Sequence, residues 1–587
     1  MKLTVSTIGR RVLGHKFAAV ALVTLVGCLA AIAEEHDNDG QHFWPGNLVV
    51  SRSVYDNNKG NVAVGAIVPP GCGVSGKTGA CPSVTKKQPF KSAPNDGTYP
   101  TVWNDNLYDG SFGITSKILL DQITESGHFI NTLEVPNSSD PGIISTSDQM
   151  VTSFSSKSEL ALNLSTDGKI LTFMGYLAPI DALDVSNSNT AGVVDPTNPV
   201  GESFYRAVAA VDRWGKFKFT LTNAYSGNNG RAAILNNRHG GNVIYTAGNA
   251  GNGANPQPNG VIIGAGAQIM TPSITPEGGQ VPLDPTPVGS FNITQLGLPH
   301  DKIGKDTNFR GLTIFENVLY FTKGSGGNGV NTVYFIDTTG SACPNGVGLP
   351  VKHAVLPPTG IVFNPANLQS LGVFPYNMCI LKGFPADLNS TNVDFPFGLF
   401  FADDKTLYVA DEGSNDNTYS AATNMYTGAA AQTTAGLQKW IFDDISSSWK
   451  YAYTLFAGLN LGVPYTVTGY PTGNNSVTGL PWSPATEGLR NIAGEVEGHG
   501  DDNRLWDRDD HRKVTIWGIT STVSGNGDQG ADPNKLVKVT DLLKNTDPAV
   551  AATESFSLVR SAEILEVLRG VSFTPGSDDD DSEHHHD

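Results

Sequence analysis

Hydrophobic and polar residues alternate over short runs along most of the chain, and turn-forming residues separate these runs. Val318–Phe321 and Thr406–Val409 are examples, and each is followed within a few positions by glycine or aspartate. No long stretch repeats its apolar residues with the helical period of about 3.6 positions. Short runs bounded by turn residues are typical of β-strands, so the pattern predicts an all-β protein.

The strand-like runs recur as a four-stranded unit. The opening strand begins with arginine or phenylalanine and then a small residue, and a second strand, a loop rich in Gly, Asn and Asp, and two further strands follow. The opening positions are Arg231, Arg310, Phe397, Arg490 and Arg569. Four-stranded units repeated along one chain indicate a β-propeller.

We expect six four-stranded blades, with seven as the alternative count. The first blade is split, because Leu568–Thr574 from the C-terminal end supplies its innermost strand. Joining the two ends of the chain in one sheet removes the free strand edge that an open row of blades would leave. The other strands of this blade are expected at 47–56, 116–123 and 128–135, and the remaining blades at 158–222 (opening at Glu159), 230–296, 309–385, 396–456 and 489–560. The propeller then spans residues 34–575 as one domain with long loop insertions, before a disordered acidic and histidine-containing tail at 576–587.

The unit at 396–456 resembles a known repeat. Its segments Pro396–Leu399, Leu407–Asp411 and Gly436–Phe442 are similar to the NHL-type propeller repeat, and the other units match that repeat in outline. The whole chain also looks like a class of secreted propeller proteins. The resemblance implies a propeller fold with a ligand-binding face, and it does not choose between a binding scaffold and an enzyme.

The first 33 residues read as a secretory signal peptide. Four basic residues and no acidic residue lie before the apolar stretch Phe17–Ala33. This stretch ends in a small-x-small cleavage site before Glu34. We therefore expect a secreted, extracellular or periplasmic protein, with no transmembrane segment in the mature chain. An uncleaved anchor and a lipoprotein attached through Cys28 are the alternatives.

Cleavage of this signal would leave an even number of cysteines. They are Cys72, Cys81, Cys343 and Cys379. An even count in an exported chain suggests disulfides, and the nearest-neighbour pairing is Cys72–Cys81 with Cys343–Cys379.

The composition disfavours some classes of binding partner. The formal net charge is −18, which disfavours nucleic acid and anionic membranes, and charged residues make up only 16 % of the chain. We expect a monomer that binds a small anionic molecule or an extracellular partner.

The arginines that open the repeat units suggest a binding site. In a propeller the innermost strands line the axial channel, so Arg231, Arg310, Arg490 and Arg569 would form a ring, with Glu159 and Phe397 at the two other positions. Like charges around one axis need compensation. Acids such as Glu159, Asp411 and Glu412 would make the ring structural, whereas a bound anion would make it a ligand site, and both interpretations stay open.

A loop at 526–532 is the best candidate for a metal site. Asn526, Asp528 and Asp532 place side-chain oxygens at alternating positions, as calcium loops do, although the full EF-hand spacing is absent. Calcium and a plain turn are the alternatives here.

Two functions from different classes fit these features. The first is a secreted, non-catalytic propeller that binds a ligand or partner at its channel mouth and loops. The second is a metal-assisted propeller hydrolase or lyase that acts on an acidic, ester or lactone substrate. The sequence contains no coherent catalytic set, which favours the first.

Overall fold

The computed structural model describes residues 42–62, 64, 95–104, 112–136, 149–188, 204–249, 266–273, 285–293, 308–324, 330–359, 377–386, 394–497 and 512–576. The chain divides into the units Met1–His42 and Phe43–Asp587, and every described residue except His42 belongs to the second. The predictions for the signal peptide, Cys28, the Cys72–Cys81 disulfide and positions 577–587 of the tail lie outside the described residues.

Strands dominate the described part of the chain, as the sequence predicts. Among the described residues, regular helix is limited to α3 (Thr427–Ala430), α4 (Pro548–Ala551) and the short 3-10 turns η2 (Thr101–Trp103), η3 (Val185–Asn187) and η5 (Gln529–Ala531). Within these described ranges, no helix has the length and apolar character needed to cross a lipid bilayer.

The largest sheet contains both the first and the last strand. Its order is β29-β1-β2-β4-β6-β7-β8, with β3 paired to β2 and β5 paired to β6. The bounds are β1 Leu48–Val54, β2 Thr115–Ile123, β3 Phe129–Glu134, β4 Gln149–Ser153, β5 Asn163–Leu164, β6 Ile170–Ala178, β7 Arg206–Asp212, β8 Phe217–Thr222 and β29 Glu566–Phe573.

The remaining described strands form successive sheets in sequence order, antiparallel apart from two short parallel pairings in the second sheet. They are β9–β12 (Gly230–Asn236, Val243–Gly248, Ala267–Met270, Val288–Ser290), β13–β18 (Asn292–Ile293, Phe309–Phe315, Val318–Lys323, Thr332–Asp337, Val347–Gly348, Asn377–Leu381), β19, β20, β23 and β24 (Pro396–Asp403, Thr406–Asp411, Gly436–Asp443, Ser448–Leu455), and β25–β28 (Ala485–Glu497, Lys513–Val523, Lys535–Leu542, Ser557–Ser561). A two-stranded ribbon, β21 (Tyr419–Ser420) with β22 (Met425–Tyr426), projects from the third of these.

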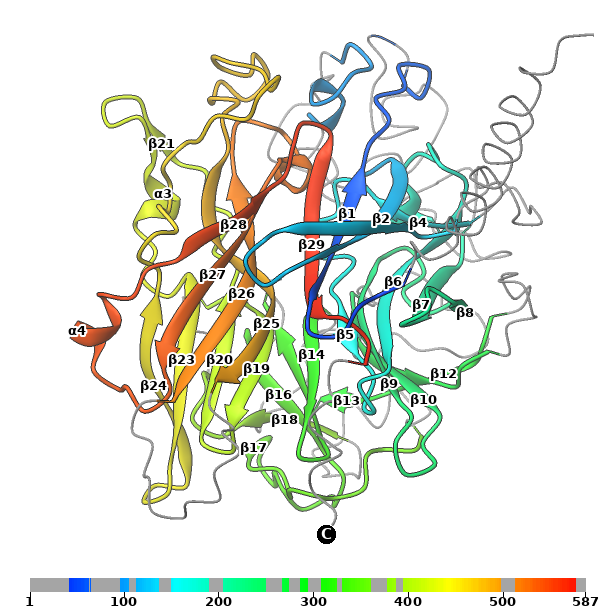
Figure 1. The fold of residues 1–587 in the computed structure, drawn as a ribbon, viewed down its shortest axis with the longest axis vertical. Coiled ribbons are helices and arrows are strands. Elements are labelled where there is room, and N and C mark those ends of the chain that lie inside the picture. Colours follow the sequence, from blue (N-terminus) through cyan, green and yellow to red (C-terminus); the bar gives the residue numbers. More distant parts are fainter. Residues whose placement is uncertain are drawn as a thin grey trace, which may run out of the picture. The chain divides into compact units, whose positions relative to one another are not determined.

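The opening strands of successive sheets lie side by side around a closed cycle (Figure 1). Strand β9 contacts β14, β14 contacts β19, β19 contacts β25, β25 contacts β29, β29 contacts β5, and β6 beside β5 contacts β9. This is a β-propeller-like ring of sheets. The hydrophobic core fills the spaces between neighbouring sheets, for example where Trp517 of β26 packs in one cluster with Leu48 of β1 and Leu568 of β29.

A β-bulge interrupts the opening strand at the repeated arginine or phenylalanine. At this bulge in each of β9, β14, β19, β25 and β29, one or two residues have no partner opposite them on the neighbouring strand. The first of these unpaired positions is Arg231, Arg310, Phe397, Arg490 or Arg569. Because a bulge redirects the side chain of the extra residue, these five positions are structurally equivalent.

The small residue after the bulge is required by packing between sheets. A Cβ atom at Gly311 would lie 2.3 Å from the carbonyl oxygen of Phe397, and one at Gly570 would lie 2.4 Å from that of Leu160. At Gly398 the corresponding distance, to the oxygen of Arg490, is 2.7 Å. At these three positions the opening strand meets a neighbouring backbone directly, which explains why glycine follows the arginine or phenylalanine there.

The last strand completes the first sheet, as the sequence predicts. Strand β29 pairs antiparallel with β1, and Leu48 lies opposite Phe573. Ion pairs reinforce the closure, because Arg52 of β1 binds Glu566 of β29 at 2.5 Å and buried Asp121 of β2 at 2.5 Å. The sheet edge that β1 would otherwise expose is thus covered.

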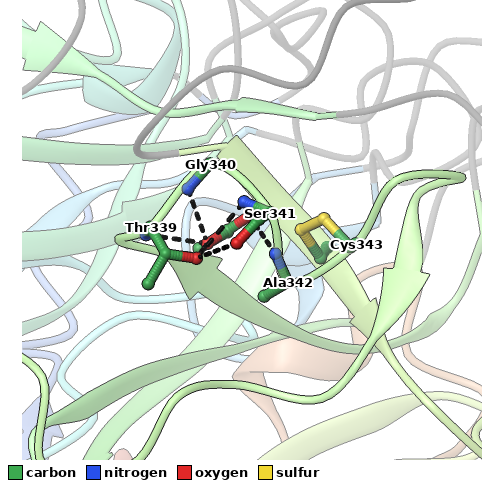
Figure 2. Close-up of a disulfide and its surroundings, with 7 residues drawn as sticks. Thr339, Gly340, Ser341, Ala342 and Cys343 are labelled. Atoms are coloured by element: carbon green, nitrogen blue, oxygen red, sulfur yellow. Dashed lines mark hydrogen bonds between the residues drawn. A yellow bond between two sulfur atoms is a disulfide. The ribbon is translucent and has the colours of Figure 1, made fainter.

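The Cys343–Cys379 disulfide joins the turn after β16 to β18 (Figure 2). The carboxylate of Asp337 at the end of β16 organises this turn, since it accepts hydrogen bonds from the backbone nitrogens of Thr339, Gly340 and Ala342 at 2.9–3.0 Å. The predicted pairing of these two cysteines is confirmed.

One predicted strand is different in the structure. The run that opens the second unit at Glu159 does not form a strand until β5, because Leu160 adopts a positive φ of 62°. Its backbone still contacts the neighbouring opening strand, with Ala161 N donating to the Arg231 carbonyl oxygen at 3.3 Å.

Candidate functional site

The bulge arginines form a buried cationic layer at the opening strands. The relative solvent exposure of these residues is only 3–8 %, and they are Arg231, Arg310, Arg490 and Arg569. Arg310 lies close enough to Arg231 and to Arg490, and Arg490 to Arg569, for the charge of one to lower the pKa of the next, after the larger effect of burial. The structure thus brings the four sequence-predicted arginines together, and we call this set the arginine layer.

One carboxylate bridges two members of the layer. Glu412, directly after β20, places Oε1 3.0 Å from Arg310 Nη2 and Oε2 3.2 Å from Arg490 Nε. Arg310 also donates to Ser158 Oγ at 2.5 Å. Glu412 is therefore the shared counter-ion of this half of the layer.

The other two arginines use neutral acceptors in their recorded contacts with described residues. Arg231 donates from Nη1 to the carbonyl oxygen of Phe309 at 2.8 Å and to the side chain of Asn308. Arg569 donates from Nε to Ser53 Oγ at 3.1 Å and from its terminal nitrogens to the carbonyl oxygens of Phe154 and Ser156. These contacts fix the guanidinium groups without neutralising their charge.

Two of the predicted acidic partners do not pair with the arginines in the described structure. Glu159 accepts from Thr152 Oγ1 at 2.7 Å and from Tyr176 OH at 2.5 Å. Asp411 accepts from the backbone nitrogens of Phe395 and Gly413, both at 2.9 Å, and its burial raises its pKa to about 8. Of the three acids named from the sequence, Glu412 alone forms arginine ion pairs among the described residues.

Three further charged residues lie beside the layer. Sequence reasoning missed Lys157 and Glu487, the second of which belongs to β25, whereas Asp528 is one of the predicted calcium residues. Lys157 donates to Asn415 Oδ1 at 2.8 Å, and burial lowers its pKa while nearby Asp528 opposes that shift. Glu487 accepts from Gln432 Nε2 at 2.9 Å. Burial raises the pKa of both Glu487 and Asp528 to about 7.

Cationic and acidic groups are mixed in this region. Each of the acids Glu159, Glu412, Glu487 and Asp528 raises the pKa of at least one cation in the set of the four arginines and Lys157. Among the described residues, Arg310 and Arg490 are the members of this set that form ion pairs.

A cavity of about 630 Å³ lies further along the same opening strands. Its walls include Leu162, Ile234, Leu399, Ile492 and Val571, each two or three residues beyond Glu159 or a bulge position. Polar groups from Arg238, His239, Glu316 and His353 also line it. A cavity of this size has room for a small molecule, and its lining offers both polar and apolar contacts.

The predicted calcium residues lie together in a buried loop around η5. Asn526 Oδ1 accepts from Asp528 N at 3.3 Å, and its Nδ2 lies 3.4 Å from Asp532 Oδ1, so the amide already joins the two acids. Asp528 also accepts from Gly530 N at 3.2 Å at the start of η5. These bonds are those of a self-supporting turn, and calcium binding there stays a prediction.

Comparisons with known proteins give little guidance. No protein-family model and no curated protein matches the chain. Among solved structures, a candidate phosphatase from Bacteroides thetaiotaomicron is 13 % identical and covers 76 % of this chain and 85 % of its own, with a TM-score of 0.23. A PL25 ulvan lyase is 9 % identical over 78 % of this chain and 91 % of its own, with a TM-score of 0.27. Likeness at this level assigns no function.

Proposed function

We propose that this protein is a secreted six-bladed β-propeller that binds an anionic small molecule in its axial channel. The observation that carries the proposal is that two of the four layer arginines have no ion-pair partner among the described residues. Arg231 and Arg569 are nearly fully buried and hydrogen-bond to neutral groups, and a buried charge that is not paired directly is costly. A bound anion would supply a direct partner.

The cavity beside the layer supports the size and chemistry of the ligand. A molecule with a carboxylate, phosphate or sulfate group would direct that group toward the arginines. Its less polar part would lie against Leu399, Ile492 and Val571 in the cavity. The ligand class we propose is therefore a small organic anion with an apolar body, including acidic sugars with an apolar face.

The blade count of six rests on the cycle of contacts between opening strands. If β4 is a link between two blades, the nine-stranded sheet becomes one blade of β29, β1, β2 and β3 and a second of β5–β8. Only two residue pairs join β2 to β4, which supports this division. The NHL-like character of the unit at 396–456 stays a proposal of the same kind.

Export is supported by the disulfide. Structural disulfides persist in oxidising compartments, and Cys343–Cys379 is buried within its sheet. We propose that the mature chain begins near Glu34. The mass of the secreted protein tests this, and an intact first residue or a lipid on Cys28 would contradict it.

Ligand-dependent melting tests the binding function. The full chain is heated with a panel of carboxylates, phosphates, sulfates and acidic sugars, and hits are measured by calorimetry. We expect Arg569→Gln to abolish the stabilisation by a hit, because binding stabilises the fold only while the site exists. Arg213→Gln, in the β7–β8 turn, is the matched control and should bind like the original chain.

The result also separates the two function classes. If no anion changes the melting temperature, the binding proposal is wrong. If a hit is consumed during incubation, as followed by NMR of the ligand, and a chelator stops this, the metal-assisted hydrolase or lyase is the better assignment.

A further inference from the structure

A second buried charged cluster lies away from the channel, between the sheet of β19–β24 and the sheet of β25–β28. Lys439 of β23 and Asp541 of β27 both have completely buried side chains, and Lys439 Nζ lies 2.9 Å from Asp541 Oδ2. Lys439 Nζ also donates to the carbonyl oxygen of Leu542 at 2.8 Å. An amine and a carboxyl group are therefore held in contact with water excluded.

Two phenol groups hold the Asp541 carboxyl group. Tyr408 OH donates to Oδ2 at 2.5 Å, and Tyr453 OH donates to Oδ1 at 2.8 Å. The Lys439 ammonium position lies 5.5 Å and 5.4 Å from the centres of the same two rings. Donors on both carboxyl oxygens polarise the carboxyl carbon and would stabilise an oxyanion formed there.

A second acid completes the cluster. Glu554 lies beside Asp541, and burial together with the Asp541 carboxyl group raises the pKa of Glu554 to about 8, so Glu554 carries a proton at neutral pH. Burial lowers the pKa of Lys439, which makes the loss of its proton easier. The cluster thus combines an amine, a carboxyl group and an acid that can move protons between them.

We propose that Lys439 and Asp541 are joined by an intramolecular amide bond that forms without any other catalyst. Glu554 gives its proton to the Asp541 carboxyl group and takes one from the Lys439 ammonium group, which leaves a neutral amine. Lys439 Nζ then attacks Asp541 Cγ, so the N–Cγ bond forms and the Cγ–OH bond breaks. Glu554 gives its proton to the departing hydroxyl and takes the proton that the nitrogen loses. One water leaves, and no oxidant, nucleotide or metal is consumed.

Contact and desolvation favour the reaction at this pair. Holding the reacting atoms in contact removes the entropic cost of bringing them together. Lys405 and Asp444 are also close, at 2.6 Å, but their side chains are 50 % and 66 % exposed. Both stay hydrated and ionised there, and a hydrated ammonium group is no nucleophile, so this pair is an internal control.

The mass of the full chain tests the bond. We expect the denatured and reduced protein to be lighter than its sequence by one water, and a protease digest to contain a branched peptide with Lys439 linked to Asp541. The peptides with Lys405 and Asp444 should be unlinked. Lys439→Arg and Glu554→Gln should each restore the full mass, apart from the substitution itself, whereas Lys405→Arg should leave the loss of water unchanged.

The outcomes decide the proposal without ambiguity. A full-mass original chain with separate, unmodified Lys439 and Asp541 peptides would show that the cluster is an ion pair only. A linked Glu554→Gln protein would keep the bond and remove Glu554 from the mechanism. If a variant fails to fold, the mass of the original chain still decides whether the bond exists.

Discussion

Replacing Glu412 should destabilise the fold more than replacing either arginine it binds. Glu412→Gln keeps the shape of the side chain and leaves Arg310 and Arg490 without their shared carboxylate. Removal of one partner of a buried ion pair typically costs about 3–5 kcal/mol. Arg310→Gln leaves Glu412 paired with Arg490 at 3.2 Å, so we expect a loss of about 1.5–3 kcal/mol, as for one charged hydrogen bond.

Urea unfolding measures these differences, with refolding checked so that free energies of unfolding are defined. Arg310→Gln, Glu412→Gln and the double variant form a cycle, and side chains in contact should be coupled by about 0.5–3 kcal/mol. A Glu412→Gln loss no larger than that of Arg310→Gln would refute the bridging role. So would a coupling energy of zero.

Three further predictions follow from packing, closure and protonation. Gly311→Ala places Cβ 2.3 Å from the neighbouring strand's carbonyl oxygen and should cost about 1–3 kcal/mol, while Gly518→Ala, with 3.3 Å to its nearest atom, should cost less; equal melting temperatures would contradict this. Deletion after Arg560 removes β29 and should abolish cooperative melting, whereas deletion of 577–587 should not; a normally melting first truncation would disprove closure. The pKa of Asp528 rises from 3.8 to about 7 on folding, so the folded state binds a proton that the unfolded state releases, and stability should fall as pH rises through this window. Asp528→Asn should reduce that slope in urea titrations at several pH values, and an unchanged slope would exclude this carboxyl group.

The repeated features of the fold could be predicted from the sequence. Arg310-Gly311 and Arg569-Gly570 stand out because both opening strands carry a bulge and meet a neighbouring backbone in close contact. The pairing of β29 with β1 could also be anticipated, because a closed ring needs both ends of the chain.

The non-repeated features could not be predicted in the same way. The repeat pattern marks neither Lys157 nor Glu487 as a neighbour of the arginine layer, and it marks Asp528 only as an oxygen ligand in a loop. Lys439 and Asp541 lie on different sheets, and nothing in the local pattern of either strand marks a charged residue that becomes fully buried. Sequence periodicity reports which face of a strand is buried, and it does not report which distant side chain lies opposite.

The pairing of β1 with β29 also governs the order in which this protein can fold. Leu48 meets Phe573 across almost the whole described chain. Loop-closure entropy grows only slowly with length, by about 0.6 kcal/mol for each doubling, so this contact costs little at equilibrium. Its effect is kinetic, because folding slows as contacts become more distant in sequence. During synthesis one edge of β1 therefore stays unpaired until β29 has been made. A chain that is interrupted or shortened before β29 keeps this exposed edge, which favours aggregation.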